Sequence, residues 1–325
     1  MASGNSKILG FTLIELSIVL VIIGLIVGGI LTGRDLIETA AQRAQIAQIE
    51  KYGTAIRTFQ LKYGYLPGDI PDPYASNFGF SARGTGVPGG EGDGNGILQG
   101  YVAADGVTGA AAEAVGETAI FWADLSTAGL VDVNIQSYDA KGAGYPSAYH
   151  INSQAITLSS SPGLYQWLPT AKLGNGNFVY VWSNASSASV ANTYKNYFAV
   201  STITDFFNNH DYETTVNPGV TVTQAYNIDK KTDDGVPLAG NVTACYVNWN
   251  SGYHGYGIPP AGLSLGQTGA NAGWANGSRC NAFTTAVTYD PANCYDNGGV
   301  AGKAQAYSVA QNASSTNCAL SFGLQ

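Results

Sequence analysis

The sequence predicts an α+β protein in which a long N-terminal α-helix packs on a mostly antiparallel β-sheet head with long loops. Three observations support this fold class: residues 11–33 contain a single charged side chain, residues 34–64 show the spacing of an amphipathic helix, and β-branched and aromatic runs follow residue 150. The chain has 325 residues, of which 45% are hydrophobic, so it can bury a sizeable core.

The first predicted element is a membrane-spanning helix over residues 11–33. As an α-helix this segment would rise about 35 Å, enough to cross a bilayer, and Glu15 is its only charge. A secretory signal peptide has a shorter apolar core followed by a small-residue cleavage site, and this run is too long and lacks that site. Lys7 before the helix predicts a cytoplasmic N-terminus, and Arg34 on the far flank weakens this without reversing it.

Glu15 is the unusual residue of this segment. Inserting a carboxylate near the middle of a bilayer costs about 2.5 to 3.5 kcal/mol. The presence of Glu15 in this segment therefore predicts that it has a functional role. No basic side chain lies within one helical turn of Glu15. A proteolytic cut after Gly10 would supply a cation, because it would create a positive amino terminus on Phe11.

The run G-F-T-L-I-E, from Gly10 to Glu15, resembles the class III signal of type IV pilins and of the pseudopilins of type II secretion. The resemblance covers residues 1–66 and implies that a prepilin peptidase removes residues 1–10 and methylates Phe11. It also implies that Glu15 pairs with the amino terminus of a neighbouring subunit during filament assembly.

One departure concerns the middle of the helix. The proline that many type IVa pilins carry there is absent, and Gly28, Gly29 and Gly33 stand in that region. Each glycine costs a helix interior about 1 kcal/mol, so local melting during assembly is expected around these residues.

Residues 34–64 predict an amphipathic helix of the head. One face carries Ile46, Ile49, Tyr52, Ile56, Phe59 and Tyr63 and should pack on a sheet. The opposite side carries Gln42, Arg43, Gln48, Lys51 and Lys62. Gly64 and Pro67 predict the end of the helix, so residues 11–63 would form one continuous helix of about 80 Å.

Residues 65–325 form the predicted globular α+β head. Residues 68–110 are rich in Gly, Pro, Asp and Asn and predict a long loop region, after which a helix of about 18 residues should end near Gly129. The runs FVYVWS and KNYFAVSTI, residues 178–183 and 195–203, predict antiparallel strands. Residues 246–325 show few signals of regular structure.

The four cysteines all lie in the C-terminal region: Cys245, Cys280, Cys294 and Cys318. No pair has the close spacing of a zinc or redox site, so two disulfides formed in an oxidising compartment are expected. Three pairings are open. Sequential pairing, Cys245 with Cys280 and Cys294 with Cys318, is favoured because it closes two short local loops.

Two acidic loops are candidate calcium sites, and no cofactor is required by anything in the sequence. Glu91, Asp93 and Asn95 occupy positions 1, 3 and 5 of a calcium-binding loop, but position 12 is Val102 instead of an acid. Flanking helices are not evident either, so a true EF-hand is not expected, and a looser calcium site competes with a solvated Gly-Asp turn.

The second acidic loop groups Asp229, Asp233 and Asp234. Because some pseudopilins bind calcium in the head, the resemblance allows a metal loop here. The alternative is a capped turn whose aspartates accept backbone N–H groups.

Catalysis and nucleic-acid binding find little support in the sequence. His150, His210 and His254 lie in different loops, and no nucleophile-elbow or zinc-protease motif is present. The formal net charge of −8 supplies no general attraction to phosphate backbones. The chain is not expected to be an enzyme.

The resemblance implies a structural subunit of a type IV pilus-like filament, made of this chain alone or mixed with other pilins. Its other partners would be prepilin peptidase and an inner-membrane assembly platform. The chain would cross the inner membrane once with a periplasmic head, and would then enter an extracellular filament. A secretion pseudopilin and a minor or tip pilin that acts as an adhesin are the alternatives.

Overall fold

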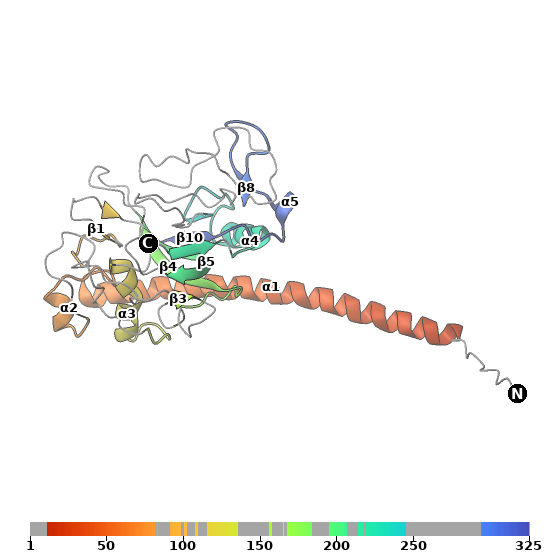
Figure 1. The fold of residues 1–325 in the computed structure, drawn as a ribbon, viewed down its shortest axis with the longest axis horizontal. Coiled ribbons are helices and arrows are strands. Elements are labelled where there is room, and N and C mark those ends of the chain that lie inside the picture. The colour runs from red at the N-terminus through yellow and green to blue at the C-terminus, as the bar shows by residue number, and fades with distance from the viewer. Residues whose placement is uncertain are drawn as a thin grey trace, which may run out of the picture.

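The computed structural model describes residues 12–81, 83, 92–98, 101–102, 108–109, 116–135, 156–157, 165, 168–183, 195–206, 214–217, 219–244 and 294–324. A long helix, α1 (Leu13–Tyr63), projects from an α+β head (Figure 1). The helix is continuous over 51 residues and runs through the glycines around residue 30 without a break. It ends at Gly64, which adopts φ +81° and donates its N–H to the carbonyl of Gln60.

The second half of α1 packs on the head through the predicted face. Tyr52, Ile56 and Phe59 are buried, and Ile46, Ile49 and Tyr63 are half-buried against the core. The prediction for the opposite side was wrong at two positions. Gln42 is buried. The side chain of Gln48 hydrogen-bonds to the backbone of residues 170 and 172, where loop 168–173 meets that flank of the helix.

The head is organised around an antiparallel sheet with β5 (Asn196–Phe206) at its centre. On one side β5 pairs with β4 (Asn177–Ser183) and β3 (Ile156–Thr157). On the other it pairs with β10 (Leu320–Gly323) and β6 (Thr214–Asn217), and β7 (Val242–Thr243) adds to β10. Val200 of β5 lies opposite Val179 and Leu320 and is fully buried, so the middle of this sheet belongs to the core.

Two helices of the head lie close to α1. Helix α3 (Gly116–Thr127) has 12 residues instead of the expected 18 or so; residues 110–115, which would carry its predicted start, lie outside the described residues. Its core-facing role is confirmed, because Ile120, Phe121 and Leu125 are fully buried. Helix α4 (Val222–Thr232) was not predicted, although Thr221 and Gln224 form a capping box at its start.

An aromatic cluster joins α1, α3 and the sheet. The ring of Tyr52 on α1 meets Trp122 of α3 edge-on, with the ring centroids 4.8 Å apart. Trp122 in turn stacks on Phe198 of β5 at 5.9 Å. Such pairs contribute about 0.5 to 1.5 kcal/mol beyond burial, so this cluster holds α1 on the head.

The remaining elements are short. They are α2 (Tyr74–Asn77), α5 (Val309–Asn312), the pair β1 (Tyr101–Val102) with β2 (Thr108–Gly109), and the pair β8 (Tyr295–Asp296) with β9 (Ala306–Tyr307).

The C-terminal region contributes more regular structure than its sequence predicts. Strand β10 is an inner strand of the main sheet, and β8 and β9 form a hairpin before it. Cys294 and Cys318 form a disulfide, which confirms the expected pairing for these two residues. Cys245 and Cys280 lie outside the described residues.

Candidate functional site

The beginning of α1 carries the first candidate site, and Glu15 is bonded there within its own chain. The carboxylate of Glu15 accepts hydrogen bonds from the backbone N–H of Thr12 at 2.8 Å and from its hydroxyl at 2.7 Å. The Thr12 hydroxyl accepts the N–H of Glu15 in return, which completes a capping box. A cation was the only partner that the sequence predicted for Glu15, and its hydrogen bonds to Thr12 were not predicted. Gly10 and Phe11 lie outside the described residues.

The first half of α1 is an unpaired apolar surface. From Leu13 to Leu31 its large hydrophobic side chains are between 49% and 87% exposed, so the described part of the head leaves them uncovered. The helix is long and apolar enough to cross a membrane, by length and composition. Figure 1 shows that this half extends beyond the sheet.

Asp93 and Asn95, from the first acidic loop, stabilise the local turn. The carboxylate of Asp93 accepts the N–H of Asn95 at 3.0 Å, and the amide oxygen of Asn95 accepts the N–H of Ile97 at 2.7 Å. These are Asx-turn contacts. Glu91 lies outside the described residues.

The same loop encloses a buried carboxylate that the sequence analysis missed. Asp69 is only 1% exposed, and its two oxygens accept the N–H groups of Gly94 and Gly96, each at 2.8 Å. Burial, and the nearby carboxylate of Asp93, raise the pKa of Asp69 to about 7, although the N–H donors act in the opposite direction.

A second buried carboxylate, Glu117 of α3, holds the start of this loop. It accepts the N–H of Gly92 at 2.8 Å and that of Asp93 at 3.3 Å. Oxygens of Asp69, Asp93 and Glu117 lie within 4.8 Å of one another. Because backbone N–H groups point at the two buried carboxylates, the arrangement favours a loop clamped by hydrogen bonds over calcium ligation.

The second acidic cluster begins within the last turn of α4, with a buried aspartate. Asp229 is fully buried; its carboxylate accepts the N–H of Gly235 at 3.1 Å and the hydroxyl of Tyr307 at 2.8 Å. Burial is the main cause that raises the pKa of Asp229 to about 6. Tyr307 and Gly235 therefore satisfy a carboxyl group that solvent does not reach.

The other two aspartates of this loop are exposed and also cap the backbone. Asp233 accepts the N–H of Val242 at 2.9 Å, and Asp234 accepts that of Val236 at 2.8 Å. One oxygen of each and one of Asp229 lie within 4.8 Å of one another. The structure thus brings all three predicted residues together, with the contacts of the capped-turn alternative.

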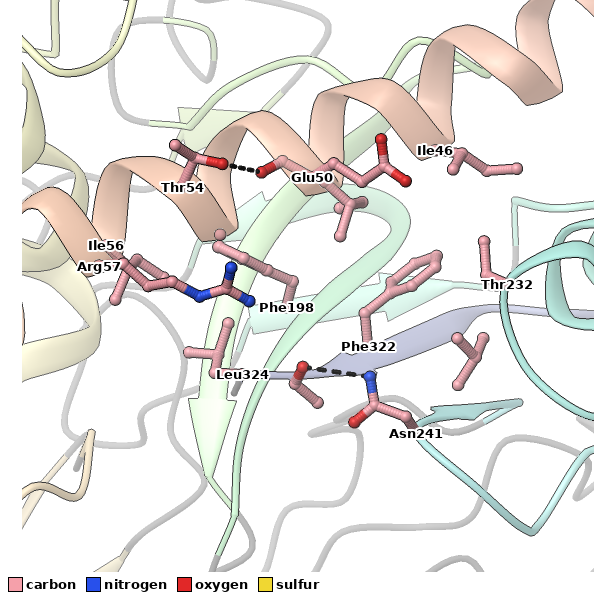
Figure 2. A pocket seen from close by; sticks show the side chains of 14 residues that line it. Ile46, Glu50, Thr54, Ile56, Arg57, Phe198, Thr232, Asn241, Phe322 and Leu324 are labelled. Atoms are coloured by element: carbon pink, nitrogen blue, oxygen red, sulfur yellow. Dashed lines mark hydrogen bonds between the residues drawn. The ribbon is translucent and has the colours of Figure 1, made fainter.

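A groove of about 290 Å³ runs between α1 and the β7–β10 edge of the sheet (Figure 2). Its floor includes Phe198 and Phe322, and Glu50 and Arg57 stand on the α1 side. In Figure 2 the guanidinium of Arg57 extends from the helix toward Phe198, and Asn241 closes the strand side through its bond to the carbonyl of Gly323.

No catalytic arrangement appears in the part of the chain that the structure describes. The three histidines, His150, His210 and His254, lie outside that part. Asp69 and Asp229, the two aspartates whose pKa values are raised to about 7 and about 6, both accept backbone N–H groups. The described residues thus form an α+β head on a long helix with an exposed apolar half.

The part of the chain that matches a known family model lies at its N-terminus. Residues 5–31 match the family model described as the prokaryotic N-terminal methylation motif. No curated protein and no solved structure matches the chain. The matched residues contain the predicted cleavage and methylation positions, Glu15 and most of the exposed apolar helix. The chain therefore carries the prepilin motif of type IV pilins and pseudopilins, followed by a pilin-like long helix and an α+β head.

Proposed function

We propose that this protein is a structural subunit of a type IV pilus-like filament, assembled through the first half of α1. The observation that carries the proposal is the methylation motif at residues 5–31 leading into a helix whose apolar side chains are exposed on all sides. In the membrane, lipid covers that surface. Outside it, only other copies of the same helix offer a surface of matching chemistry and length.

Processing and location follow from the same proposal. Prepilin peptidase would cut after Gly10 and methylate Phe11, with the head on the periplasmic side before assembly and on the filament surface afterwards. The amino terminus of a neighbouring subunit would then compete with Thr12 for the carboxylate of Glu15. Because Glu15 already has partners in the single chain, the exchange costs less than burying an unpaired charge.

A pilus subunit is favoured over a secretion pseudopilin. The head is large, and the Cys294–Cys318 disulfide ties its C-terminal region to the sheet, which suits an exposed extracellular filament. Major pseudopilins are small and carry a compact calcium loop. An adhesive role for the head, with the chain as a minor or tip subunit, would appear as binding of sheared filaments to glycans.

Calcium binding stays a proposal, and the loop at Asp229, Asp233 and Asp234 is the better of the two candidates. Asp233 and Asp234 are exposed, and the described residues supply hydrogen bonds to only one oxygen of each. Calorimetric titration of the full-length protein in detergent with CaCl₂ tests it. Binding lost in Asp234→Asn and kept in Asp93→Asn supports this site; equal titration curves for all three proteins remove it.

The function is tested by mass spectrometry of the N-terminal peptide from sheared surface material and from membranes. N-methylated Phe11 in the sheared fraction is the expected result, with Glu15→Ala leaving processed protein in the membrane and none in the sheared fraction. Gln60→Ala, an exposed position on the second half of the same helix, serves as the control. An uncleaved Met1 terminus confined to membranes would contradict the proposal.

A further inference from the structure

Four asparagines of the chain are followed directly by glycine: Asn95, Asn175, Asn276 and Asn297. In such a pair the backbone nitrogen of the glycine can attack the side-chain carboxamide of the asparagine, because glycine has no side chain to hinder the approach. The pair at Asn276 lies outside the described residues. The other three pairs have different environments in the structure, and these environments determine which of the three can react.

The pair Asn175–Gly176 forms the tip of a tight turn. Asn175 adopts φ +54° and Gly176 φ +73°, and the N–H of Asn177 donates to the carbonyl of Gly174 at 3.0 Å. Two consecutive positive φ values inside such a bond are characteristic of a type I′ turn. In the described part of the chain, Asn175 is the only residue other than glycine with a positive φ. This backbone conformation is less favourable for asparagine than for glycine, so the turn stores some strain at Asn175.

The groups that would react in this turn are exposed and unrestrained. Asn175 and Gly176 are both exposed. Within the described part of the chain, neither the carboxamide of Asn175 nor the N–H of Gly176 takes part in a hydrogen bond. Water therefore reaches both groups, and bond formation between them breaks no hydrogen bond that either group makes.

The pair at Asn95 is held by its neighbours. The amide of Asn95 donates to the carboxylate of Asp93 at 2.8 Å, and its oxygen accepts the N–H of Ile97 at 2.7 Å. The nitrogen that would attack, that of Gly96, donates to the buried carboxylate of Asp69 at 2.8 Å. Attack by Gly96 on Asn95 would therefore break several hydrogen bonds at once.

The pair at Asn297 is protected by burial. Asn297 is only 1% exposed, and its carbonyl accepts the N–H of Val300 at 3.3 Å. The reaction needs room for the glycine nitrogen to reach the side chain, and its second step needs water. Both become available at Asn297 only when the surrounding chain opens.

We propose that Asn175 is a self-modification site, at which the side chain closes a ring with Gly176 and is deamidated without an enzyme. The glycine nitrogen forms a bond to Cγ of Asn175 and gives up its proton to water, while ammonia leaves from Cγ, which produces a succinimide. One water molecule then opens the ring and yields aspartate or isoaspartate. The sum is asparagine plus water giving the acid plus ammonia, with no oxidation or reduction. Each reacted chain gains one negative charge and about 1 Da.

The isoaspartate product would change the turn itself. Isoaspartate routes the main chain through the former side chain, and so adds one atom between Asn175 and Gly176. The turn connects loop 168–173 to strand β4, and Thr170 and Phe178 form a β-bridge across it. An extra main-chain atom should therefore loosen this bridge in older copies of the protein. The inference does not depend on assembly into filaments.

Ageing of the purified full-length protein in detergent, at mildly alkaline pH, tests the site. Peptide mapping by mass spectrometry should show the gain of about 1 Da at Asn175 at least about fivefold faster than at Asn95 or Asn297, because those two react only after local opening. In denaturant the three pairs should react within about threefold of one another, since the differences in environment are lost. A synthetic standard of each acid distinguishes aspartate from isoaspartate.

Asn175→Gly is the matched control, because glycine suits the positive φ of the turn and removes the reacting carboxamide. Its peptide should show no mass gain on ageing, which excludes Asn177 in the same peptide as the source. Equal rates at the three pairs in the folded protein would overturn the proposal. A mass gain at Asn175 in denaturant but not in the folded protein would also overturn it, by showing that the turn protects Asn175.

Discussion

The guanidinium of Arg83 donates a hydrogen bond to the carboxylate of Asp124 at 2.6 Å, and both side chains are almost completely buried. Asp124 also accepts the N–H of Gly68 at 2.7 Å, and Arg83 donates to the carbonyl of Ile70 at 3.1 Å. This pair therefore joins α3 to the chain segment that leaves α1. It lies beside the loop that Asp69 and Glu117 clamp, since Gly92 of that loop approaches both Ile70 and Arg83.

Removing one partner of this ion pair should be costly. Asp124→Ala leaves a buried guanidinium without its counter-charge and is expected to lower the free energy of unfolding by about 3 to 5 kcal/mol, measured by chemical denaturation in detergent. Lys51→Ala is the control, because its ion pair with Asp132 is exposed and should contribute less than about 1 kcal/mol. Equal losses in the two variants would show that burial does not strengthen the Arg83 pair.

The stability of the head should fall as pH rises through neutrality. The pKa of Asp69 is raised to about 7 in the folded protein, above its ordinary value near 4, so the folded state binds more protons than the unfolded state between these values. This contribution is complete below about pH 4 and is lost progressively as pH rises to about 7, the folded-state pKa. Asp229, with a pKa raised to about 6, adds a similar fall slightly lower in the range.

Melting temperatures measured from pH 4 to pH 8 check this dependence. Asp69→Asn should flatten the curve between about pH 4 and 7 and Asp229→Asn should flatten it between about pH 4 and 6, because each variant removes one titrating group. Asp132→Asn, at an exposed carboxylate, should leave the slope unchanged. A steeper fall in Asp69→Asn than in the unmodified protein would contradict the assignment.

The Cys294–Cys318 disulfide should stabilise the C-terminal region strongly. It closes a loop across 24 residues, and both cysteines are fully buried beside strand β10. The chain-entropy model gives a loss of about 3.5 kcal/mol for Cys294→Ala/Cys318→Ala. Denaturation of the two proteins under non-reducing conditions measures the difference, and a loss below about 1 kcal/mol would mean that sheet pairing alone holds this region.

The side chain of Gln48 should hold loop 168–173 against α1 through two hydrogen bonds. Its amide donates to the carbonyl of Thr170 at 2.9 Å, and its oxygen accepts the N–H of Lys172 at 3.1 Å. Gln48→Ala is expected to cost about 1 to 2 kcal/mol and to accelerate hydrogen exchange at the amide of Lys172. Gln60→Ala, at an exposed position of the same helix, is the control. Unchanged exchange at Lys172 in Gln48→Ala would show that Gln48 does not hold the loop.

Local patterns in the sequence were sufficient for the elements that depend on near neighbours. The apolar run from residue 11, the face from Ile46 to Tyr63 and the strands around FVYVWS and KNYFAVSTI all predicted their structures correctly. Only the face from Ile46 to Tyr63 is strongly periodic, and its spacing specifies the side that faces the core. The apolar run is specified by its length, and the strands by their β-branched and aromatic residues.

Helix α4 and strand β10 could not be predicted from local sequence patterns. Helix α4 is amphipathic but short, and its end lies in an acidic run that also suits a turn. Strand β10 has four residues, and its place between β5 and β7 depends on partners far away in the sequence. Its environment is therefore set by long-range pairing, which local propensity does not record.

The candidate sites divide in the same way. By itself, the sequence determined the prepilin motif, an apolar helix long enough to span a membrane and the position of Glu15, because all of these lie along one continuous stretch of the chain. Only the tertiary structure decided that Asp69 and Glu117 clamp the loop of Asp93 and that Arg83 meets Asp124. These relationships join residues separated by 24 to 48 positions, and packing alone brings such groups together.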